Sequence, residues 1–150
     1  MDPLTHVLAT RKLISKDRNV VIAGVAADTP FYLTYPTWLI LRGQASEAFR
    51  KNEWPEAPHW MYTLHHIFHS LPVLLAVTVG IRAMRGYWPL ESAAWALHIL
   101  IDLPTHSRRN WAPQFLWPIS QITIDGVSWP DVVIPQINRL FKNSREDNNR

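Results

Sequence analysis

The chain has 150 residues, of which 47% are hydrophobic and 18% are charged, and its formal net charge is +3. This length is sufficient for one hydrophobic core, so we predict a single domain over residues 1–142 and a disordered tail at 143–150. The sequence contains no cysteine, which excludes disulfides, zinc–thiolate sites and a cysteine nucleophile. Any bound metal must therefore be held by nitrogen and oxygen ligands.

The amino-terminal part of the chain predicts two helices. Apolar residues at helical spacing predict the first over 3–14, and the apolar segment 19–33 predicts the second. Pro30 disfavours helical geometry in the residue before it, so we expect the second helix to stop near Asp28. Residues 44–60 are polar and contain two prolines, which predicts a loop.

The central part of the chain predicts further helices. Residues 61–84 have a helical pattern with an interruption at Pro72, and residues 90–102 predict an apolar helix that ends before Pro104. The run 59–81 is uncharged and long enough to span a bilayer, but it contains four histidines and a proline. These residues favour a buried helical hairpin over a membrane span.

The segment after Pro104 is irregular in pattern. Residues 112–135 contain four prolines and three short apolar runs, which indicate a packed loop, and residues 131–142 predict a final short helix. Together these patterns predict an all-α fold, a compact helical bundle with a long irregular carboxy-terminal segment that is rich in proline and tryptophan.

The amino terminus lacks the basic flank, apolar run and small-residue cleavage site of a secretory signal, so we expect a cytoplasmic protein. The mean hydropathy of −0.10 is also compatible with peripheral attachment at the inner face of the membrane. A basic surface can favour phosphates on lipids or nucleic acids. However, no basic helix or stacked aromatic pattern indicates a nucleic-acid module.

Two segments, LHHIFHSLP and LHILIDLPTHS, concentrate the candidate metal ligands. These segments contain His65, His66, His69, His98, Asp102 and His106. A spacing of four residues places His65 with His69, and His98 with Asp102, on one helical face. Neutral imidazole and carboxylate are ligands that suit zinc, manganese and iron. We therefore predict a metal site.

Other interpretations of these residues are weaker. The spacing of His65 and His69 is that of the zincin motif, but position 66 is histidine, so the general-base glutamate is missing. A histidine-rich di-iron desaturase would combine its histidines with convincing membrane spans. For Asp102, a buried carboxylate that needs a partner, the alternative to metal is a salt bridge to one of three arginines. The candidates are Arg82, Arg85 and Arg108.

Four segments resemble a known family in their order: THVLAT, GVAADTPF, HHIFHSLPVLLA and LHILIDLPTHS. They are similar to the predicted membrane-associated metal-dependent hydrolases, a family that includes LexA-regulated inner-membrane hydrolases. The resemblance covers most of residues 4–107. The corresponding positions are His6, Asp28, His69, Ser70, His98, Asp102 and Thr105.

The same order is more distantly similar to zinc-dependent phospholipase C, an all-α fold with a metal cluster in a cleft. This resemblance implies a second ion besides the first, held by His6 together with Asp102 and completed by His65 or His66. It implies that the first ion is held by Asp28, His69, His98 and Asp102.

We therefore expect a metal-dependent hydrolase that acts on a phosphoester, with lipids among the candidate substrates. Zinc is the expected ion, with manganese or iron as alternatives. Asp28 or Asp102 would orient a metal-activated water or accept its proton, and Arg108 would hold the phosphate.

Two interpretations compete with the hydrolase. One is a non-catalytic helical module that metal stabilises and that binds a protein partner or a membrane surface through tryptophans. The candidate tryptophans are Trp111, Trp117 and Trp129, although packing explains each of them as well. The other is a metal-free helical protein with buried histidines.

Overall fold

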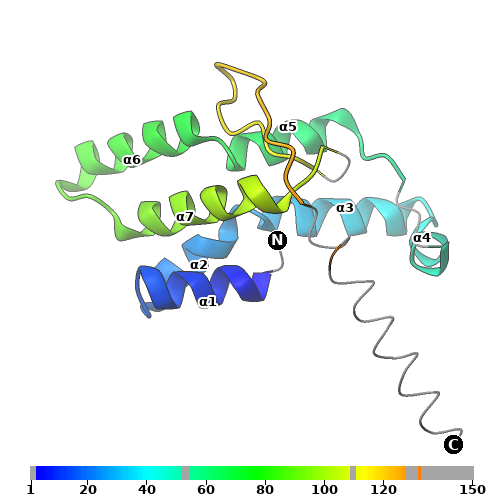
Figure 1. Cartoon of the computed structure of the whole chain (residues 1–150), viewed down its shortest axis with the longest axis horizontal. Coiled ribbons are helices and arrows are strands. Elements are labelled where there is room, and N and C mark those ends of the chain that lie inside the picture. The colour runs from blue at the N-terminus through cyan, green and yellow to red at the C-terminus, as the bar shows by residue number, and fades with distance from the viewer. Residues whose placement is uncertain (1–2, 52–54, 109–110, 128–131, 133–150) are drawn as a thin grey trace, which may run out of the picture.

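The computed structural model describes residues 3–51, 55–108, 111–127 and 132 (Figure 1). Within this part of the chain every regular element is a helix, which confirms the all-α prediction. The helices are α1 (Pro3–Leu13), α2 (Arg18–Ala26), α3 (Thr29–Leu41), α4 (Ala45–Lys51), α5 (His59–Phe68), α6 (Leu71–Arg85) and α7 (Leu90–Thr105). A single domain over residues 1–142 stays a prediction, and the predicted tail at 143–150 lies outside the described residues.

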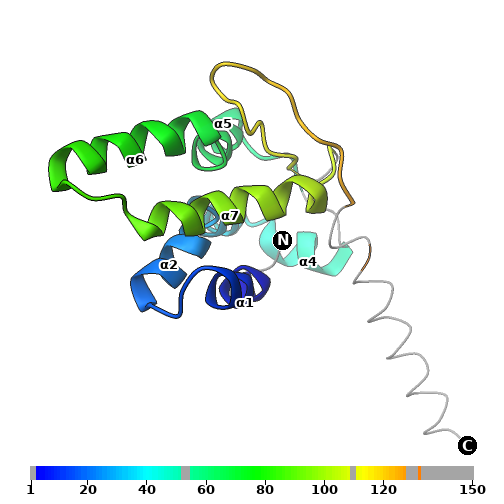
Figure 2. The same cartoon turned by 60° about the vertical axis from the view of Figure 1, so that its left-hand side comes forward.

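Helix α7 packs along α2, which in turn packs on α1, while α6 lies beside α7 on its other side (Figures 1 and 2). Helices α3 and α5 pair at the other end of the molecule. Asp17 begins α2, because its Oδ1 accepts hydrogen bonds from the backbone N–H groups of Asn19 and Val20 at 2.8 and 3.3 Å. Gly86 ends α6 in a left-handed conformation with φ 80°.

The predicted helix in the segment 19–33 and its expected stop near Asp28 are confirmed, but the helix that begins directly after Asp28 was not predicted. Helix α2 ends at Ala26 and α3 begins at Thr29. Pro30 lies in the first turn of α3, where its missing N–H removes no helical hydrogen bond. Asp28 therefore occupies the short link between two helices.

Two predicted boundaries are wrong. The polar segment 44–60 contains the short helix α4, and α7 continues through Pro104 to Thr105. Pro104 has no N–H to donate to the carbonyl of Leu100, but the helix continues for one more residue, and the Thr105 hydroxyl donates to the carbonyl of Ile101 at 2.9 Å. The helix predicted over 131–142 falls, apart from residue 132, outside the described residues.

The uncharged run 59–81 does not form the predicted buried hairpin. Helices α5 and α6 are joined by a short break and are bent by 54° relative to each other. Leu74 is the only buried side chain of α6. Among the described helices none is long and apolar enough to cross a membrane alone, whereas the bent α5–α6 pair meets those criteria by length and composition.

The segment after α7 is irregular, as predicted, and it is held against the helices by backbone hydrogen bonds. The N–H of Leu71 donates to the carbonyl of Phe115 at 2.9 Å, and the N–H of Gly126 donates to the carbonyl of His106 at 2.9 Å. The hydroxyl of Ser70 donates to the carbonyl of Trp117. The bonds of Ser70 and Leu71 hold the segment at the junction of α5 and α6, and the bond of Gly126 holds it at the end of α7.

An apolar core lies between α3, α4 and α5. It is formed by Tyr35, Leu39, Ala48, Ala57 and Met61. Trp111, from the irregular segment, packs against this core and stacks on Tyr62 with ring centroids 4.1 Å apart. The packing interpretation therefore describes Trp111, and Trp129 lies outside the described residues.

Candidate metal centre

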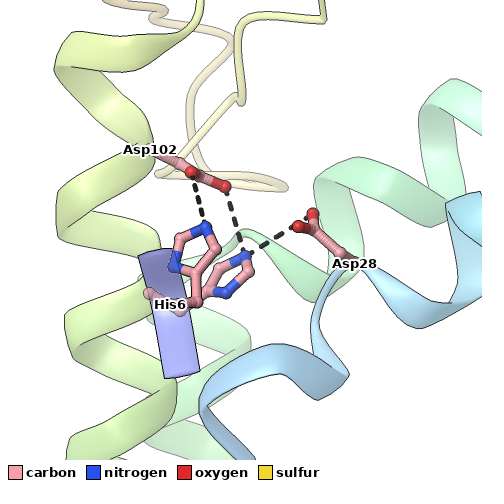
Figure 3. Close-up of side chains that lie close together, drawn as sticks. His6, Asp28 and Asp102 are labelled. Carbon is pink, nitrogen blue, oxygen red and sulfur yellow. Dashed lines mark ion pairs between the residues drawn. The ribbon is translucent and has the colours of Figure 1, made fainter. Parts of the chain in front are cut away.

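The interior between α1, α2, α5 and α7 contains a cluster of buried histidine and aspartate side chains. The buried members are His6, Asp28, His65, His69, His98 and Asp102. They come from distant parts of the sequence, and Figure 3 shows the side chains of His6 from α1, Asp28 from the α2–α3 link and Asp102 from α7 lying close together. Helices far apart in sequence therefore meet at one polar cluster.

Local sequence explains each placement. His98 and Asp102 are four residues apart on α7, so they share its buried face. His69 follows the last residue of α5, and Ser70 accepts a hydrogen bond from the N–H of Val73 to begin α6. Asp28 lies in the link directly before α3, and Pro30 lies in the first turn of that helix.

Four donor atoms converge at the centre of the cluster: Asp28 Oδ1, His69 Nε2, His98 Nε2 and Asp102 Oδ2. The two Nε2 atoms are 3.1 Å apart, and each is 3.2 Å from Asp102 Oδ2. Their distances to Asp28 Oδ1 are 3.3 Å from His69 and 3.6 Å from His98. Ligands that bind one ion tetrahedrally at 2.0–2.2 Å are about 3.3–3.6 Å apart. The spacing is therefore close to that of a tetrahedral ligand set.

Backbone carbonyls orient the two central imidazoles. The Nδ1–H of His98 donates to the carbonyl of Gly24 at 2.8 Å, and the Nδ1–H of His69 donates to the carbonyl of His65 at 2.9 Å. Such bonds fix the ring and leave Nε2 to act as the ligand atom. Gly24 is required here, because a side chain would collide with the hydroxyl of Thr10.

Asp102 uses its second oxygen on the other side of the cluster. Its Oδ1 is 3.1 Å from His6 Nε2 and 3.7 Å from His106 Nδ1. The ring of His6 stacks on that of His98 with centroids 3.8 Å apart. Both ring nitrogens of His6 are buried without hydrogen-bond geometry to any described group. Asp102 thus faces imidazoles through both carboxylate oxygens.

The cluster is strongly polarised. Burial alone would raise the pKa of Asp28 and Asp102, but hydrogen bonds from the surrounding histidines outweigh burial and hold both pKa values below their ordinary range. Burial alone would lower the pKa of His98, but its bonds to Asp102 and Asp28 raise it to about 9. The pKa of His69 is raised for the same reasons. Without metal, His98 is therefore charged near neutral pH, and it lies between the carboxylates of Asp28 and Asp102.

His65 differs from these two histidines. Burial, followed by repulsion from His69 and His106, lowers its pKa well below the ordinary value, so its ring is neutral. It stacks on His69 with centroids 4.0 Å apart. Together with Asp28 and His69, it forms a second group whose ligand atoms lie within 4.8 Å of one another.

The remaining predicted site residues lie at the edge of the cluster or outside it. His66 is half-buried and accepts a hydrogen bond from the N–H of Gln114 at 3.4 Å. His106 is partly exposed, and burial lowers its pKa. Arg108 is exposed, and its described contact is a backbone N–H donated to Asp125 Oδ1 at 2.9 Å. Its predicted role toward phosphate stays a prediction.

Sequence reasoning missed the residues that hold the ligands in place. The carbonyls of Gly24 and His65 belong to the backbone, so no pattern of side chains in the sequence predicts their contacts with His98 and His69. Gly24 leaves one weak signal, a glycine within an apolar helix, which often marks close packing.

No family model, curated protein or solved structure matches this chain. The resemblance to membrane-associated metal-dependent hydrolases therefore stays a prediction, and the geometry carries the argument alone. Six of the eight predicted metal ligands belong to two groups of described residues whose ligand atoms cluster. The groups are His6, Asp28, His98 and Asp102, and Asp28, His65 and His69. This buried cluster of histidine and aspartate could hold a metal ion.

Proposed function

We propose that the protein is a metal-dependent hydrolase that acts on a phosphoester. The observation that carries the proposal is the convergence of two imidazole nitrogens and two carboxylate oxygens, with five of their separations between 3.1 and 3.6 Å. A nitrogen and oxygen donor set of this kind fits zinc, and also manganese or iron. When bound, a divalent ion lowers the pKa of a coordinated water to about 7 and offsets charge on a phosphoryl group.

The donor set passes a test of fit that is independent of any family. Two neutral imidazoles whose Nδ1–H groups are already used would present facing lone pairs at His69 Nε2 and His98 Nε2, 3.1 Å apart. A cation or a proton between them removes this repulsion. Both carboxylates then neutralise a divalent charge.

The two aspartates have different roles in this proposal. Asp102 is fully buried and orients His6, His69 and His98. Asp28 is the more exposed of the two, with a side chain that is 10% accessible. Asp28 is therefore the carboxylate that a water could reach, and it would hold or accept that water's proton.

A panel of phosphomonoesters and phosphodiesters, including phospholipids, tests the activity. Protein loaded with zinc or manganese should hydrolyse at least one substrate, and the double variant His98→Ala, Asp102→Asn should lose both metal and activity. His59→Ala is the control, because His59 is exposed and contacts Thr63 within its own helix. Turnover that survives in a folded double variant would contradict the proposal.

A structural metal is the second candidate, and the depth of the cluster favours it. His6, His69, His98 and Asp102 are each no more than 1% exposed, and a structural ion is usually enclosed by protein ligands. Stoichiometric metal that no substrate or small anion can reach, with no turnover on the panel, would support this candidate over the hydrolase.

Contact with a lipid surface is a further part of the proposal, and it rests on α6. This helix is uncharged from Leu71 to Ile81 and exposes Leu75, Val77 and Val79. Such a surface is unusual for a helix that packs on a protein core, where the apolar side faces inward.

The residues at the end of α6 favour lipid over a protein partner. The guanidinium of Arg82 lies 5.9 Å from the ring of Trp88, and Arg85 donates to the hydroxyl of Tyr87 at 3.3 Å. Arginine beside exposed tryptophan and tyrosine is typical of the headgroup level of a membrane.

Flotation with anionic phospholipid vesicles tests this contact. The protein should float with the vesicles, and Leu75→Asp with Val79→Asp should abolish flotation. Leu33→Asp is the control, because Leu33 is equally apolar and exposed but lies on α3. Equal flotation of both variants would contradict a membrane contact through α6.

A further inference from the structure

Helix α3 contains no charged residue, yet one side of it is exposed along most of its length. Leu33 is 65% exposed and Ile40 is 67% exposed, and both recur with two other exposed residues at three- and four-residue spacing. We call this side the outer face of α3, and it consists of Leu33, Pro36, Thr37 and Ile40. The other side packs into the apolar core. A helix that is apolar on all sides is normally covered on all sides, so the outer face indicates a partner beyond the described residues.

The irregular segment is fixed at the end of α7 shortly before it leaves the described range. The N–H of Gly126 donates to the carbonyl of His106, and the N–H of Val127 donates to the carbonyl of Pro104, both at 2.9 Å. A side chain at position 126 would collide with the carbonyl of Pro104, so glycine permits this close approach. The position of Val127 is therefore well defined.

The end of α7 lies close to the first turn of α3. The ring centroid of His106 is 6.3 Å from that of His65, which is in turn 6.4 Å from that of Phe31. Phe31 is in the first turn of α3. The chain beyond Val127 therefore starts near the beginning of α3, and the four residues from there to position 131 reach at most about 14 Å.

The sequence that follows, DVVIPQINRLFK over 131–142, has the pattern of an amphipathic helix. Its apolar residues recur at three- and four-residue spacing, which places them on one helical face, and its basic residues fall on the opposite side. The apolar stripe consists of Val133, Ile137, Leu140 and Phe141, and the basic residues are Arg139 and Lys142. A helix of this length would extend about 18 Å, and α3 extends about 20 Å. The apolar stripe therefore matches the outer face of α3 in length.

We propose that residues 131–142 bind the outer face of α3 as an amphipathic helix that runs parallel to α3. In this arrangement the apolar stripe covers Leu33 and Ile40, while Arg139 and Lys142 face solvent. The parallel direction follows from the position of Val127, because the chain approaches α3 at its first turn. The proposal concerns a surface outside the metal cluster, so it goes beyond the proposed function.

Two physical arguments favour this segment over a second copy of the chain. A short tether gives the segment an effective concentration in the millimolar range, far above that of another protein molecule in dilute solution. An isolated helix of this length is only marginally stable in water, so contact with an apolar face stabilises it. The outer face of α3 and the apolar stripe therefore meet each other's need for burial.

The absence of cysteine from the sequence makes the proposal directly testable. Thr37→Cys places a single thiol at the middle of the outer face of α3, and its rate of reaction with a maleimide reports whether that face is covered. Reaction then requires the segment to leave α3, so Ile137→Asp with Leu140→Asp should increase the rate by about tenfold or more. Val79→Cys on α6 is the matched control, because Val79 is also exposed, and its rate should not change.

The full chain is used throughout, and every substitution lies outside the metal cluster and the apolar core. An equal rate for Thr37→Cys with and without the two aspartates would overturn the proposal. An equal increase at Thr37→Cys and Val79→Cys would mean a general opening of the protein and would overturn it as well. Slow reaction that becomes fast on dilution would assign the outer face of α3 to a second copy of the chain and reject the intramolecular contact.

Discussion

Helices α6 and α7 lie side by side, yet they distribute polar and apolar residues in opposite ways (Figure 1). The buried side chains of α7 include His98 and Asp102, whereas α6 buries Leu74 alone and exposes apolar residues such as Leu75. A hydroxyl pair, Thr78 to Ser92 at 2.8 Å, links the two helices. The polar face of α7 therefore holds the candidate ligands His98 and Asp102 in the interior. The apolar surface of α6 is exposed and available for contacts outside the chain.

The largest expected effect comes from breaking the polar face of α7. Asp102→Ala removes the carboxylate that faces His6, His69 and His98, and it leaves buried imidazolium charge uncompensated. We expect a loss of about 3–5 kcal/mol in the free energy of unfolding, together with loss of metal. Leu100→Ala, on the exposed face of the same helix, should change stability by no more than about 0.5 kcal/mol. Urea denaturation of both variants measures the difference, and equal losses would contradict the distinction between the two faces.

The second effect concerns pH in the metal-free protein. The pKa of His98 is raised to about 9 from an ordinary 6.5, so its charged form stabilises the fold. This contribution, roughly 3 kcal/mol, is fully present below pH 6.5 and is lost as the pH rises through about 9. The α6 surface has no such group among its buried residues. Denaturation between pH 6 and 10 should reveal a larger loss in the original protein than in His98→Ala, in which His69 is the remaining histidine with a raised pKa.

The same protonation makes metal binding pH-dependent in the opposite sense. A metal ligand must be deprotonated, and His98 and His69 both have raised pKa values. We expect metal uptake near neutral pH to release protons, and apparent affinity to increase as the pH rises toward 9. Titration calorimetry in buffers of different ionisation enthalpy counts those protons. Binding without proton release would contradict the ionised cluster.

A smaller effect is expected where backbone packing supports the ligand. Gly24→Ala would place a methyl group against Thr10 and displace the carbonyl that orients His98. We expect a loss of about 1–3 kcal/mol and weaker metal binding. Gly80→Ala on α6 is the matched control, because a methyl group there meets nothing within 4 Å, and alanine should stabilise that helix by up to about 1 kcal/mol. Thermal unfolding of the two variants should therefore shift in opposite directions.

The smallest effect is expected on the outer surface of α6. Leu75→Gln exchanges an exposed apolar side chain, 62% accessible, for a polar one of similar size. The free energy of unfolding should change by no more than about 0.5 kcal/mol. A loss greater than about 2 kcal/mol would mean that α6 is covered within the protein, and would contradict an exposed apolar surface.

The candidate ligands could be predicted from the sequence more accurately than the helix boundaries, because the spacing of residues on one helix is a local property. His98 and Asp102 four residues apart, and a helix end near Asp28, follow from local rules. The course of the chain between them depends on tertiary packing. Helix α4 forms in a segment whose composition predicts a polar loop, and α7 continues through Pro104 to Thr105 although proline normally ends a helix.

The exposure of α6 and the contacts of His65 and His66 could not be predicted for a different reason. The apolar pattern of α6 is the same whether protein or another medium covers it, so a buried hairpin was the natural expectation. Likewise, nothing in the sequence separates His65 from its neighbour His66. Only the fold turns His65 toward Asp28 and places His66 beside Gln114.

The central claim is that the cluster of His69, His98, Asp28 and Asp102 is a metal centre, and X-ray absorption spectroscopy tests it most directly. Zinc-loaded, untagged protein should show nitrogen and oxygen ligands at about 2.0–2.2 Å with the outer-shell scattering of imidazole. The folded double variant His98→Ala, Asp102→Asn should bind no stoichiometric zinc. Absence of zinc from the original protein after loading, or the same absorption spectrum from zinc bound to the double variant, would contradict the account.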